Sequence, residues 1–464
     1  MSTVNRNLIT IDDLSNEEIE AIFSLADEMS SKSEDHLSLC RGKIMATLFF
    51  EPSTRTRMSF EAAMQRLGGS IIGAVDVKST SLSKGESIAD MARVVGSYAD
   101  IIAIRHPWEG AAKLVAEYAG VPVINAGDGA HEHPTQTLCD LYTLKKEKKQ
   151  IKGLKIALCG DLKYGRTVHS LAYALARFGA TILFRSGPGL EIPEHVVRKL
   201  TTEYGGELKR HEDLNQVAKE RHFPLDAMYL TPSTPHQLAM MPDISIQIEL
   251  EKGIDALYVT RLQKERHAPT AKGEDYPVVD KKLLEEKRFR EALVMHPLPR
   301  VDELAHELDA DPRSMYFKQA ARGVPIRMAL IALLLGARQF DIPKKERQTF
   351  TRKADYPVYD RPFGVKCQNS NCVTFHEKQC TKPEFNIVNR HPLTLRCVYC
   401  EQETHPQFIA SSQWHEGTLE RKRYHSADSY WLQKIKPENL IIFDSEEDAH
   451  AQGFKSSKYI TGGA

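Results

Sequence analysis

The chain has 464 residues, of which 41% are hydrophobic and 27% charged, and its 62 Lys and Arg balance its 62 Asp and Glu. At about 150 residues per domain, this length predicts roughly three domains, and the composition excludes extended disorder. Because the formal net charge is zero, no overall field favours nucleic acid or a membrane surface as a partner.

No segment carries the pattern of an export signal or a membrane span. The first residues lack an apolar core of the secretory type, and the longest apolar run, at residues 328–337, is far shorter than the roughly 20 residues that cross a bilayer. We therefore expect a cytoplasmic protein that binds neither nucleic acid nor membrane.

Apolar strand-like runs alternate with helical periodicity over the first 340 residues. The run KIMATLFF precedes a helix expected from Arg55 to Leu67, and a second series begins with KIALCG, the loop DLKYG and the helix RTVHSLAYALARF. This alternation predicts an α/β fold with parallel sheets in two lobes, residues 1–150 and 151–340, with the last helices returning to the first lobe. We find no internal repeat.

The remaining chain divides by composition. Residues 341–362 are polar, charged and interrupted by Pro, as linkers are. A small β-rich domain crowded with cysteines is expected at 363–410, and a short module at 411–464.

The run FFEPSTRTRMSFE, at residues 49–61, places hydroxyls and guanidinium groups where a strand ends and a helix begins. The free backbone N–H groups and the dipole of a helix start attract anions, and Arg55 adds a forked pair of donors. The motif predicts a phosphate site. On this motif alone, a capped helix with Arg55 and Arg57 in surface salt bridges remains an alternative.

Three further motifs carry polar groups that suit the same chemistry. SLSKGE provides Ser81 and Lys84, RHP provides Arg105 after a strand, and HPTQT provides His133 and Gln136. Each is weak alone, because a loop Lys is usually solvated and a His before Pro usually packs in its loop.

Together with GDLKYGRTVHS, YVTRLQKER and HPLPRVDE, these motifs resemble, in order and over about residues 5–340, the signature series of the aspartate carbamoyltransferases. The resemblance implies a two-lobed carbamoyltransferase that joins carbamoyl phosphate to L-aspartate in pyrimidine biosynthesis, with no cofactor for the chemistry. It also implies a homotrimer or a multiple of it, in which Ser81 and Lys84 enter the neighbouring subunit's active site.

The resemblance assigns a role to each site residue. It implies that the phosphate and the carbamoyl group are held by Ser53, Thr54, Arg55, Thr56, Arg105, His133, Gln136 and the backbone around Leu298 and Pro299. Arg166 and Arg261 would clamp the two carboxylates of aspartate, with Gln263 beside them. The segment before residue 258 is longer than usual for the family, and we expect a surface insertion or an altered lid there.

Two alternatives compete with this interpretation. Ornithine carbamoyltransferases also carry S-T-R-T-R, but they have Cys where this chain has Pro297, and their S-M-G run is absent here. A catalytically silent scaffold that presents the cysteine domain to a partner enzyme is the other alternative, and the complete set of site residues argues against it.

Five of the eight cysteines lie close together near the C-terminus. Cys367 and Cys372 form C-x4-C, and Cys397 and Cys400 form C-x2-C, a pattern typical of structural zinc sites with four thiolates. We expect Cys380 to be a buried thiol, and His376 and His391 are alternative ligands.

This segment, with its N-S-N, resembles the zinc domain of the regulatory chain of aspartate carbamoyltransferase, which docks on the catalytic chain. A zinc ribbon that binds nucleic acid is the less favoured alternative. The regulatory chain's nucleotide-binding domain is expected to be absent, because only about 25 residues precede Cys367 after the second lobe.

The last residues resemble a decayed copy of the small metal-binding module of Ada-type DNA repair proteins. Ser429, Ser457 and Ile460 stand where that module has cysteines. We therefore expect no metal there, and this tail or the zinc domain could serve as a docking surface for a partner protein.

Overall fold

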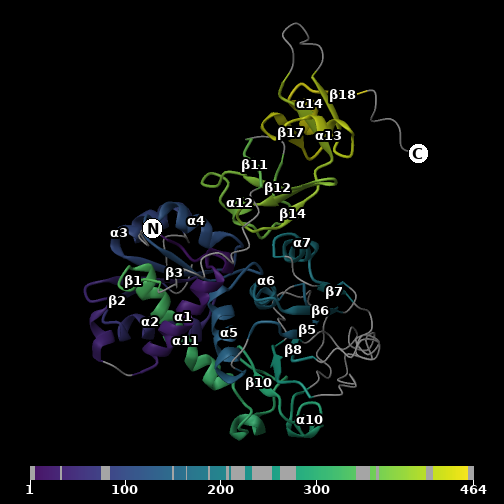
Figure 1. Cartoon of the computed structure of the whole chain (residues 1–464). Coiled ribbons are helices and arrows are strands. Elements are labelled where there is room, and N and C mark those ends of the chain that lie inside the picture. Colours follow the sequence, from purple (N-terminus) through teal and green to yellow (C-terminus); the bar gives the residue numbers. More distant parts are fainter. Residues whose placement is uncertain are drawn as a thin grey trace.

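The computed structural model describes residues 6–31, 34–74, 84–148, 151–163, 165–186, 189–204, 208–210, 225–231, 253–261, 278–340, 356–361, 365–413 and 422–457. Within these residues the strands form two parallel sheets, one for each lobe, and two smaller sheets toward the C-terminus. Figure 1 shows the two lobes side by side, with the C-terminal sheets rising from the side where the lobes meet.

The first lobe is built on a four-stranded parallel sheet in the order β2-β1-β3-β4. Its strands are β1 (Ile44–Phe49), β2 (Ser70–Ala74), β3 (Ile101–His106) and β4 (Val123–Asp128). Its helices are α1 (Asn16–Met29), α2 (Thr54–Arg66), α3 (Ile88–Tyr98), α4 (Ala111–Tyr118) and α5 (Pro134–Lys148), with short 3-10 segments at Ile11–Asp13 and Glu34–Ser38. Every residue of β3 and β4 is buried, as expected for parallel strands covered on both faces.

The second lobe has a six-stranded parallel sheet in the order β10-β9-β8-β5-β6-β7. Its strands are β5 (Lys155–Gly160), β6 (Thr181–Ser186), β7 (Leu208–Arg210), β8 (Ala227–Thr231), β9 (Ala256–Val259) and β10 (Leu293–Met295). Its helices are α6 (Arg166–Arg177), α7 (Glu194–Thr202) and α10 (Lys281–Glu285), followed by a 3-10 segment at His306–Ala310.

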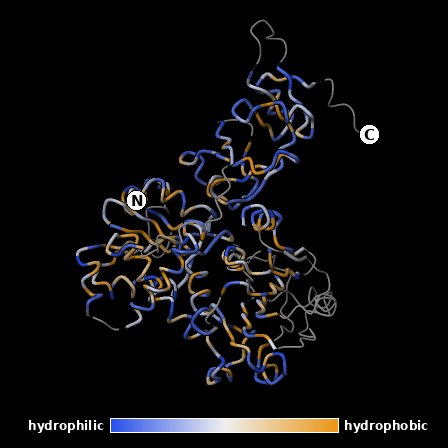
Figure 2. The backbone as a smooth tube through the Cα atoms, viewed as in Figure 1, coloured by the Kyte–Doolittle hydropathy of each residue, from blue (hydrophilic) through white to orange (hydrophobic). Residues whose placement is uncertain are grey.

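The long helix α11 (Tyr316–Leu334) joins the two lobes. It packs against α1, α2 and α5 of the first lobe, and residues from both lobes share one hydrophobic core. Apolar segments of the chain, drawn orange, concentrate in the inner parts of the two lobes (Figure 2). None of the described helices combines the length and hydropathy of a membrane span.

The expectation of a surface insertion before residue 258 is wrong for the part that the structure describes. Residues 227–231 form β8, which is buried throughout and lies in the middle of the sheet between β5 and β9. The following residues of that segment lie outside the described ranges.

The C-terminal part contains two small sheets. The first, with strand order β11-β12-β13-β14, contains β11 (Val358–Tyr359), β12 (Phe385–Arg390), β13 (Leu393–Cys397) and β14 (Glu403–Thr404), with α12 (Val373–His376) beside it. The second, with strand order β17-β15-β16-β18, contains β15 (Phe408–Ser411), β16 (Arg423–Ser426), β17 (Leu440–Phe443) and β18 (Lys455–Ser456), with α13 (Trp431–Lys434), α14 (Glu446–Ala451) and a 3-10 segment at Pro437–Asn439.

Candidate active site and metal centre

A cavity of 560 Å³ lies between the two lobes and α11. The predicted site residues that line it are Ser53, Thr54, Arg55, Thr56, Arg105, His133, Gln136, Arg261, Leu298 and Pro299. Lys84 is exposed and does not line this cavity. Arg166 is the first residue of α6, but its side chain, like Ser81 and Gln263, lies outside the described residues.

The start of α2 presents cationic and hydroxyl groups to the cavity. The helix begins at Thr54, directly after the loop that leaves β1, so its first backbone N–H groups have no partner within the helix. Burial and then the charge of Arg261 lower the pKa of Arg55, which places two cationic side chains from different lobes near one another. The surface salt bridge considered as an alternative exists for Arg57, which lies 3.4 Å from Glu61.

Arg105 is the last residue but one of β3 and is only 7% exposed. Its Nη2 donates to Glu51 Oε1 at 2.6 Å, and its Nη1 donates to the carbonyl oxygen of Ala126 at 3.3 Å. These two bonds fix the guanidinium at the wall of the cavity beside the start of α2. A fixed cation at this place suits an anionic ligand.

His133 precedes α5 and is buried at the same wall. Its Nδ1 accepts the backbone N–H of Gln136 at 3.4 Å, an arrangement that places the ring proton on Nε2. In that tautomer the other ring nitrogen can donate a hydrogen bond to a carbonyl oxygen.

Asp140 organises the cavity floor and was missed in the sequence. Its Oδ1 accepts from Gln136 Nε2 at 2.8 Å and from Gln319 Nε2 at 2.7 Å, and its Oδ2 accepts from the Tyr258 hydroxyl at 3.0 Å. Gln319 Oε1 in turn accepts the backbone N–H of His296 at 3.0 Å. Asp140 follows Gln136 by four residues in α5, and this spacing was the signal that could have identified it.

Burial raises the pKa of Asp140 to about 7. Between pH 4 and pH 7 the folded protein therefore keeps a proton on Asp140 that the unfolded chain releases, so this residue costs stability as the pH rises. We expect the melting temperature of the wild type, relative to Asp140→Asn, to fall from pH 5 to pH 8. A pH-independent difference in differential scanning fluorimetry would contradict the elevated pKa.

The second lobe supplies the opposite wall. Arg261 follows the end of β9, and Thr167, Thr231 and Thr260 line the cavity with it. Beneath them the rings of Tyr229 and Tyr258 stack with centroids 4.6 Å apart. The cavity thus has cationic and hydroxyl groups on both walls.

Comparison with known proteins assigns this architecture. The carbamoyl-phosphate-binding domain of the aspartate/ornithine carbamoyltransferases matches residues 6–146, and their Asp/Orn-binding domain matches residues 237–334. The aspartate carbamoyltransferase catalytic subunit of Clostridium botulinum strain Okra is 46% identical over 339 residues, 72% of this chain and 99% of that protein. The chain belongs to the aspartate/ornithine carbamoyltransferase family.

Other relatives agree with this assignment. The catalytic subunit from Picrophilus torridus is 45% identical, over 72% of this chain and 99% of its own length. The structure of the catalytic subunit of M. jannaschii aspartate transcarbamoylase has a TM-score of 0.57 and 42% identity, covering 71% of this chain and 98% of its own. The Trypanosoma cruzi aspartate transcarbamoylase in complex with carbamoyl phosphate has a TM-score of 0.57 and 36% identity, covering 71% and 95%.

The metal-binding domain of the aspartate carbamoyltransferase regulatory chain matches residues 361–409 of the same chain. There the Sγ atoms of Cys367, Cys372, Cys397 and Cys400 all lie within 4.8 Å of one another. The Cys367–Cys400 and Cys372–Cys397 pairs are separated by 3.5 Å and 3.9 Å. Sulfurs bound tetrahedrally to zinc at about 2.3 Å lie about 3.8 Å apart, so this set fits such an ion.

The remaining candidate ligands are not part of this cluster. Cys380 is half-buried, so the expectation of a buried thiol is wrong, and its carbonyl oxygen accepts from the Tyr118 hydroxyl at 2.7 Å. His391 is exposed, and the His376 ring stacks on Trp108 at 4.1 Å. Four thiolates would complete the coordination shell of a bound ion and leave no open position.

The metal-binding domain contacts the first lobe through backbone pairing. Glu109 N–H donates to the carbonyl oxygen of Asn371 at 3.0 Å, and the N–H of Val373 donates to the carbonyl oxygen of Glu109 at 2.8 Å. The Glu109 side chain accepts from Asn369 Nδ2 at 2.7 Å. The N-S-N run between the first two cysteines is therefore part of the docking surface.

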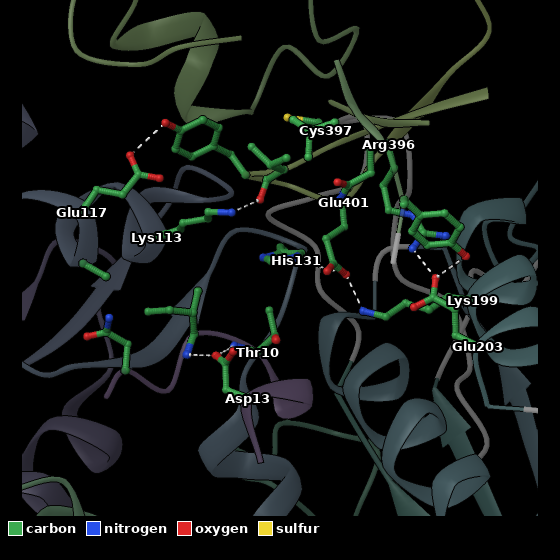
Figure 3. Close-up of a pocket in the computed structure, with 18 of the residues that line it drawn as sticks. Thr10, Asp13, Lys113, Glu117, His131, Lys199, Glu203, Arg396, Cys397 and Glu401 are labelled. Carbon is green, nitrogen blue, oxygen red and sulfur yellow. Dashed lines mark hydrogen bonds and ion pairs between the residues drawn. The ribbon is translucent and has the colours of Figure 1, made fainter. Parts of the chain in front are cut away.

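The same domain also reaches the second lobe, around a cavity of 850 Å³ (Figure 3). Lys199 Nζ of α7 lies 2.7 Å from Glu401 and 2.7 Å from Asp12 of the first lobe, and Arg396 pairs with Glu203. His131, Glu132 and Glu401 also bring three possible metal ligands together, but the Lys199 ammonium already supplies positive charge there. The metal-binding domain thus joins both lobes.

Proposed function

We propose that this chain transfers the carbamoyl group of carbamoyl phosphate to L-aspartate, forming N-carbamoyl-L-aspartate and phosphate for pyrimidine biosynthesis. The observation that carries the proposal is the cavity between the lobes, where Arg55 and Arg105 from the first lobe face Arg261 from the second. The relatives from Clostridium botulinum and Picrophilus torridus are aspartate carbamoyltransferase catalytic subunits, which is consistent with this reaction.

In this proposal the first lobe binds carbamoyl phosphate. The start of α2, with Ser53, Thr54 and Thr56, and the guanidinium groups of Arg55 and Arg105 hold the phosphate. His133 Nε2 donates to the carbamoyl oxygen as negative charge develops there during attack by the amine. Gln136, held by Asp140, and the backbone around Leu298 and Pro299 bind the carbamoyl amide.

The second lobe binds aspartate. We assign its two carboxylates to Arg166 and Arg261, with Gln263 beside them, because planar guanidinium groups match carboxylates. The cationic walls also argue for a diacid over ornithine, whose side chain carries a positive charge. Glu51, an acidic group of the cavity wall, is paired with Arg105 at 2.6 Å.

A direct assay tests the substrate. Phosphate release from carbamoyl phosphate should saturate with L-aspartate and stay at the background rate with L-ornithine, and the product should be N-carbamoyl-L-aspartate by mass. Turnover with ornithine but not with aspartate would identify the chain as an ornithine carbamoyltransferase. No turnover with either amino acid would favour the silent scaffold.

We further propose a homotrimer, or a multiple of it, in which Ser81 and Lys84 complete the neighbouring site. Lys84 is exposed and lies outside the cavity of its own chain, which supports such a role. Mixing inactive Lys84→Ala with inactive Arg55→Ala should restore activity, up to about a quarter of the sites at equal mixing. Mixing Lys84→Ala with a chain that carries both Lys84→Ala and Arg55→Ala should restore no activity. Equal activity in the two mixtures would contradict a site shared between subunits.

We propose that the four cysteines hold a structural Zn²⁺ and that the protein works in the cytoplasm as a fusion of catalytic and regulatory-type domains. The metal-binding domain would brace the two lobes of its own chain. Glu401 and Arg396 pair with the second lobe at α7 and directly after it, and Asn371 pairs with the first lobe. Metal analysis of protein purified without chelator tests the identity of the ion.

A further inference from the structure

Two adjacent strands of the second lobe carry nearly the same sequence. Residues 226–231 read DAMYLT, and residues 255–260 read DALYVT. The strands pair in parallel with the repeated residues opposite one another, for example Ala227 with Ala256 and Tyr229 with Tyr258. The sequence therefore does contain a short internal repeat, and β8 is a second copy of the strand that leads to Arg261.

The repeat directs equivalent side chains to the same face of the sheet. Side chains alternate along a strand, so Tyr229 and Thr231 share one face of β8, and Tyr258 and Thr260 share the matching face beside them. Tyr258 on this face bonds to Asp140 at the cavity floor. Met228, Leu230, Leu257 and Val259 pack into a different hydrophobic cluster on the other face.

Close backbone contacts with β5 on one side and β9 on the other fix the position of the end of β8. The carbonyl oxygen of Thr231 would lie 1.7 Å from a Cβ at Gly160, a glycine with φ +97° at the end of β5. On the other side the N–H of Thr260 donates to the carbonyl oxygen of Leu230 at 3.0 Å. Thr231 thus stands between the loop that leads to Arg166 and the strand that leads to Arg261.

The hydroxyls of Thr231 and Thr260 have unused hydrogen-bonding capacity. The residues are 3% and 6% exposed, and neither Oγ1 makes a hydrogen bond within the described part of the chain. Both residues line the cavity. Burial raises the pKa of Tyr229 well above its usual range, and a weak interaction with the neighbouring Thr231 hydroxyl lowers it, but the two oxygens do not meet hydrogen-bond geometry. Buried polar groups of native proteins are nearly always bonded, so a hydroxyl of this kind in a substrate cavity indicates a partner on the substrate.

We propose that the Thr231 hydroxyl donates a hydrogen bond to a carboxylate of the bound amino-acid substrate and is a specificity-determining residue of that half of the site. The inference rests on the proposed function and names a residue of its second substrate site. A carboxylate is the partner because Thr231 lies on the second-lobe wall, one strand away from Arg261, at a spacing of about 4.8 Å between strands. The phosphate and the carbamoyl oxygen of the other substrate are assigned to groups of the first lobe.

The test compares Thr231→Val, which keeps the side-chain shape, with Thr231→Ser, which keeps the hydroxyl. Loss of a hydrogen bond to a charged group corresponds to about a tenfold to hundredfold loss of affinity. We expect Thr231→Val to raise the KM for aspartate by that factor and to leave the KM for carbamoyl phosphate within about twofold, with Thr231→Ser near the wild type. Met228→Leu, on the opposite face of β8, should leave both constants unchanged.

A binding measurement accompanies the kinetics. Succinate is an unreactive four-carbon dicarboxylate, and its affinity in the presence of carbamoyl phosphate, measured by calorimetry, should fall in Thr231→Val by the same factor. If Thr231→Val does not fold, Thr231→Ala compared with Thr231→Ser isolates the hydroxyl in the same way.

The outcomes separate the two claims. If the wild-type protein shows no turnover with aspartate, both the proposed function and the inference are overturned. A wild type that uses aspartate, together with a Thr231→Val variant whose aspartate KM stays within twofold, would overturn the inference alone. Equal losses in the Val and Ser variants would show a packing effect and would also overturn it.

Discussion

Replacing Arg55 with Ala is expected to lower kcat by at least about 10² to 10³ while the protein stays folded. The guanidinium lies at the start of α2, where a phosphate would gain negative charge as the carbamoyl group leaves, so its contribution is greatest in the transition state. Steady-state kinetics with both substrates measure the effect, and circular dichroism checks the fold.

Arg57→Ala is the matched control. It removes an arginine from the same turn of α2, but Arg57 does not line the cavity and pairs with Glu61. Its kcat should stay within a few-fold of the wild type, because a partly exposed ion pair between successive turns of one helix contributes little. Equal losses in the two variants would remove the assignment of Arg55 to the phosphate.

Replacing Cys397 with Ser is expected to release the metal and unfold the domain around it. Thiolate zinc sites supply about 10 kcal/mol or more of apparent binding free energy, which is most of the folding free energy of a domain this small. The change should also lower the stability of the lobes, because Lys199 loses Glu401 and Glu203 loses Arg396 as buried ion-pair partners. Metal analysis measures the loss of the metal, and hydrogen exchange measures the unfolding of residues 365–405 and the weaker protection of the lobes.

Cys380→Ser provides the comparison, since Cys380 lies outside the four-cysteine cluster. That variant should keep about one metal ion per chain and the exchange protection of the wild type. Retention of metal and protection in Cys397→Ser would show that the four thiolates are not the ligands.

The sequence predicted the features that short segments determine. The first-lobe helix was expected from Arg55 to Leu67, and α2 spans Thr54–Arg66. The apolar runs before it and after Lys152 became β1 and β5, because buried parallel strands read as continuous apolar segments. The four clustered cysteines were likewise identifiable from spacing alone.

Features that depend on contacts distant in sequence were not predicted. β8 was included in a presumed surface insertion, because a five-residue apolar run does not reveal whether it lies at the surface or in the middle of a sheet. The Lys199–Glu401 pair joins residues 202 positions apart, and no local pattern links them. Asp140 followed a recognised motif, but its role depends on Gln319 and Tyr258, which the fold brings to it.

The most direct test of a shared cavity for both substrates is calorimetric titration with N-(phosphonacetyl)-L-aspartate, which joins a phosphonate and an aspartate in one molecule. We expect one molecule to bind per chain, far more tightly than aspartate alone, with competition from carbamoyl phosphate. Arg55→Ala and Arg261→Ala should each weaken this binding, because each removes a cation from one wall. Absence of binding to the wild type, or binding that neither variant weakens, would contradict the location of the active site between the lobes.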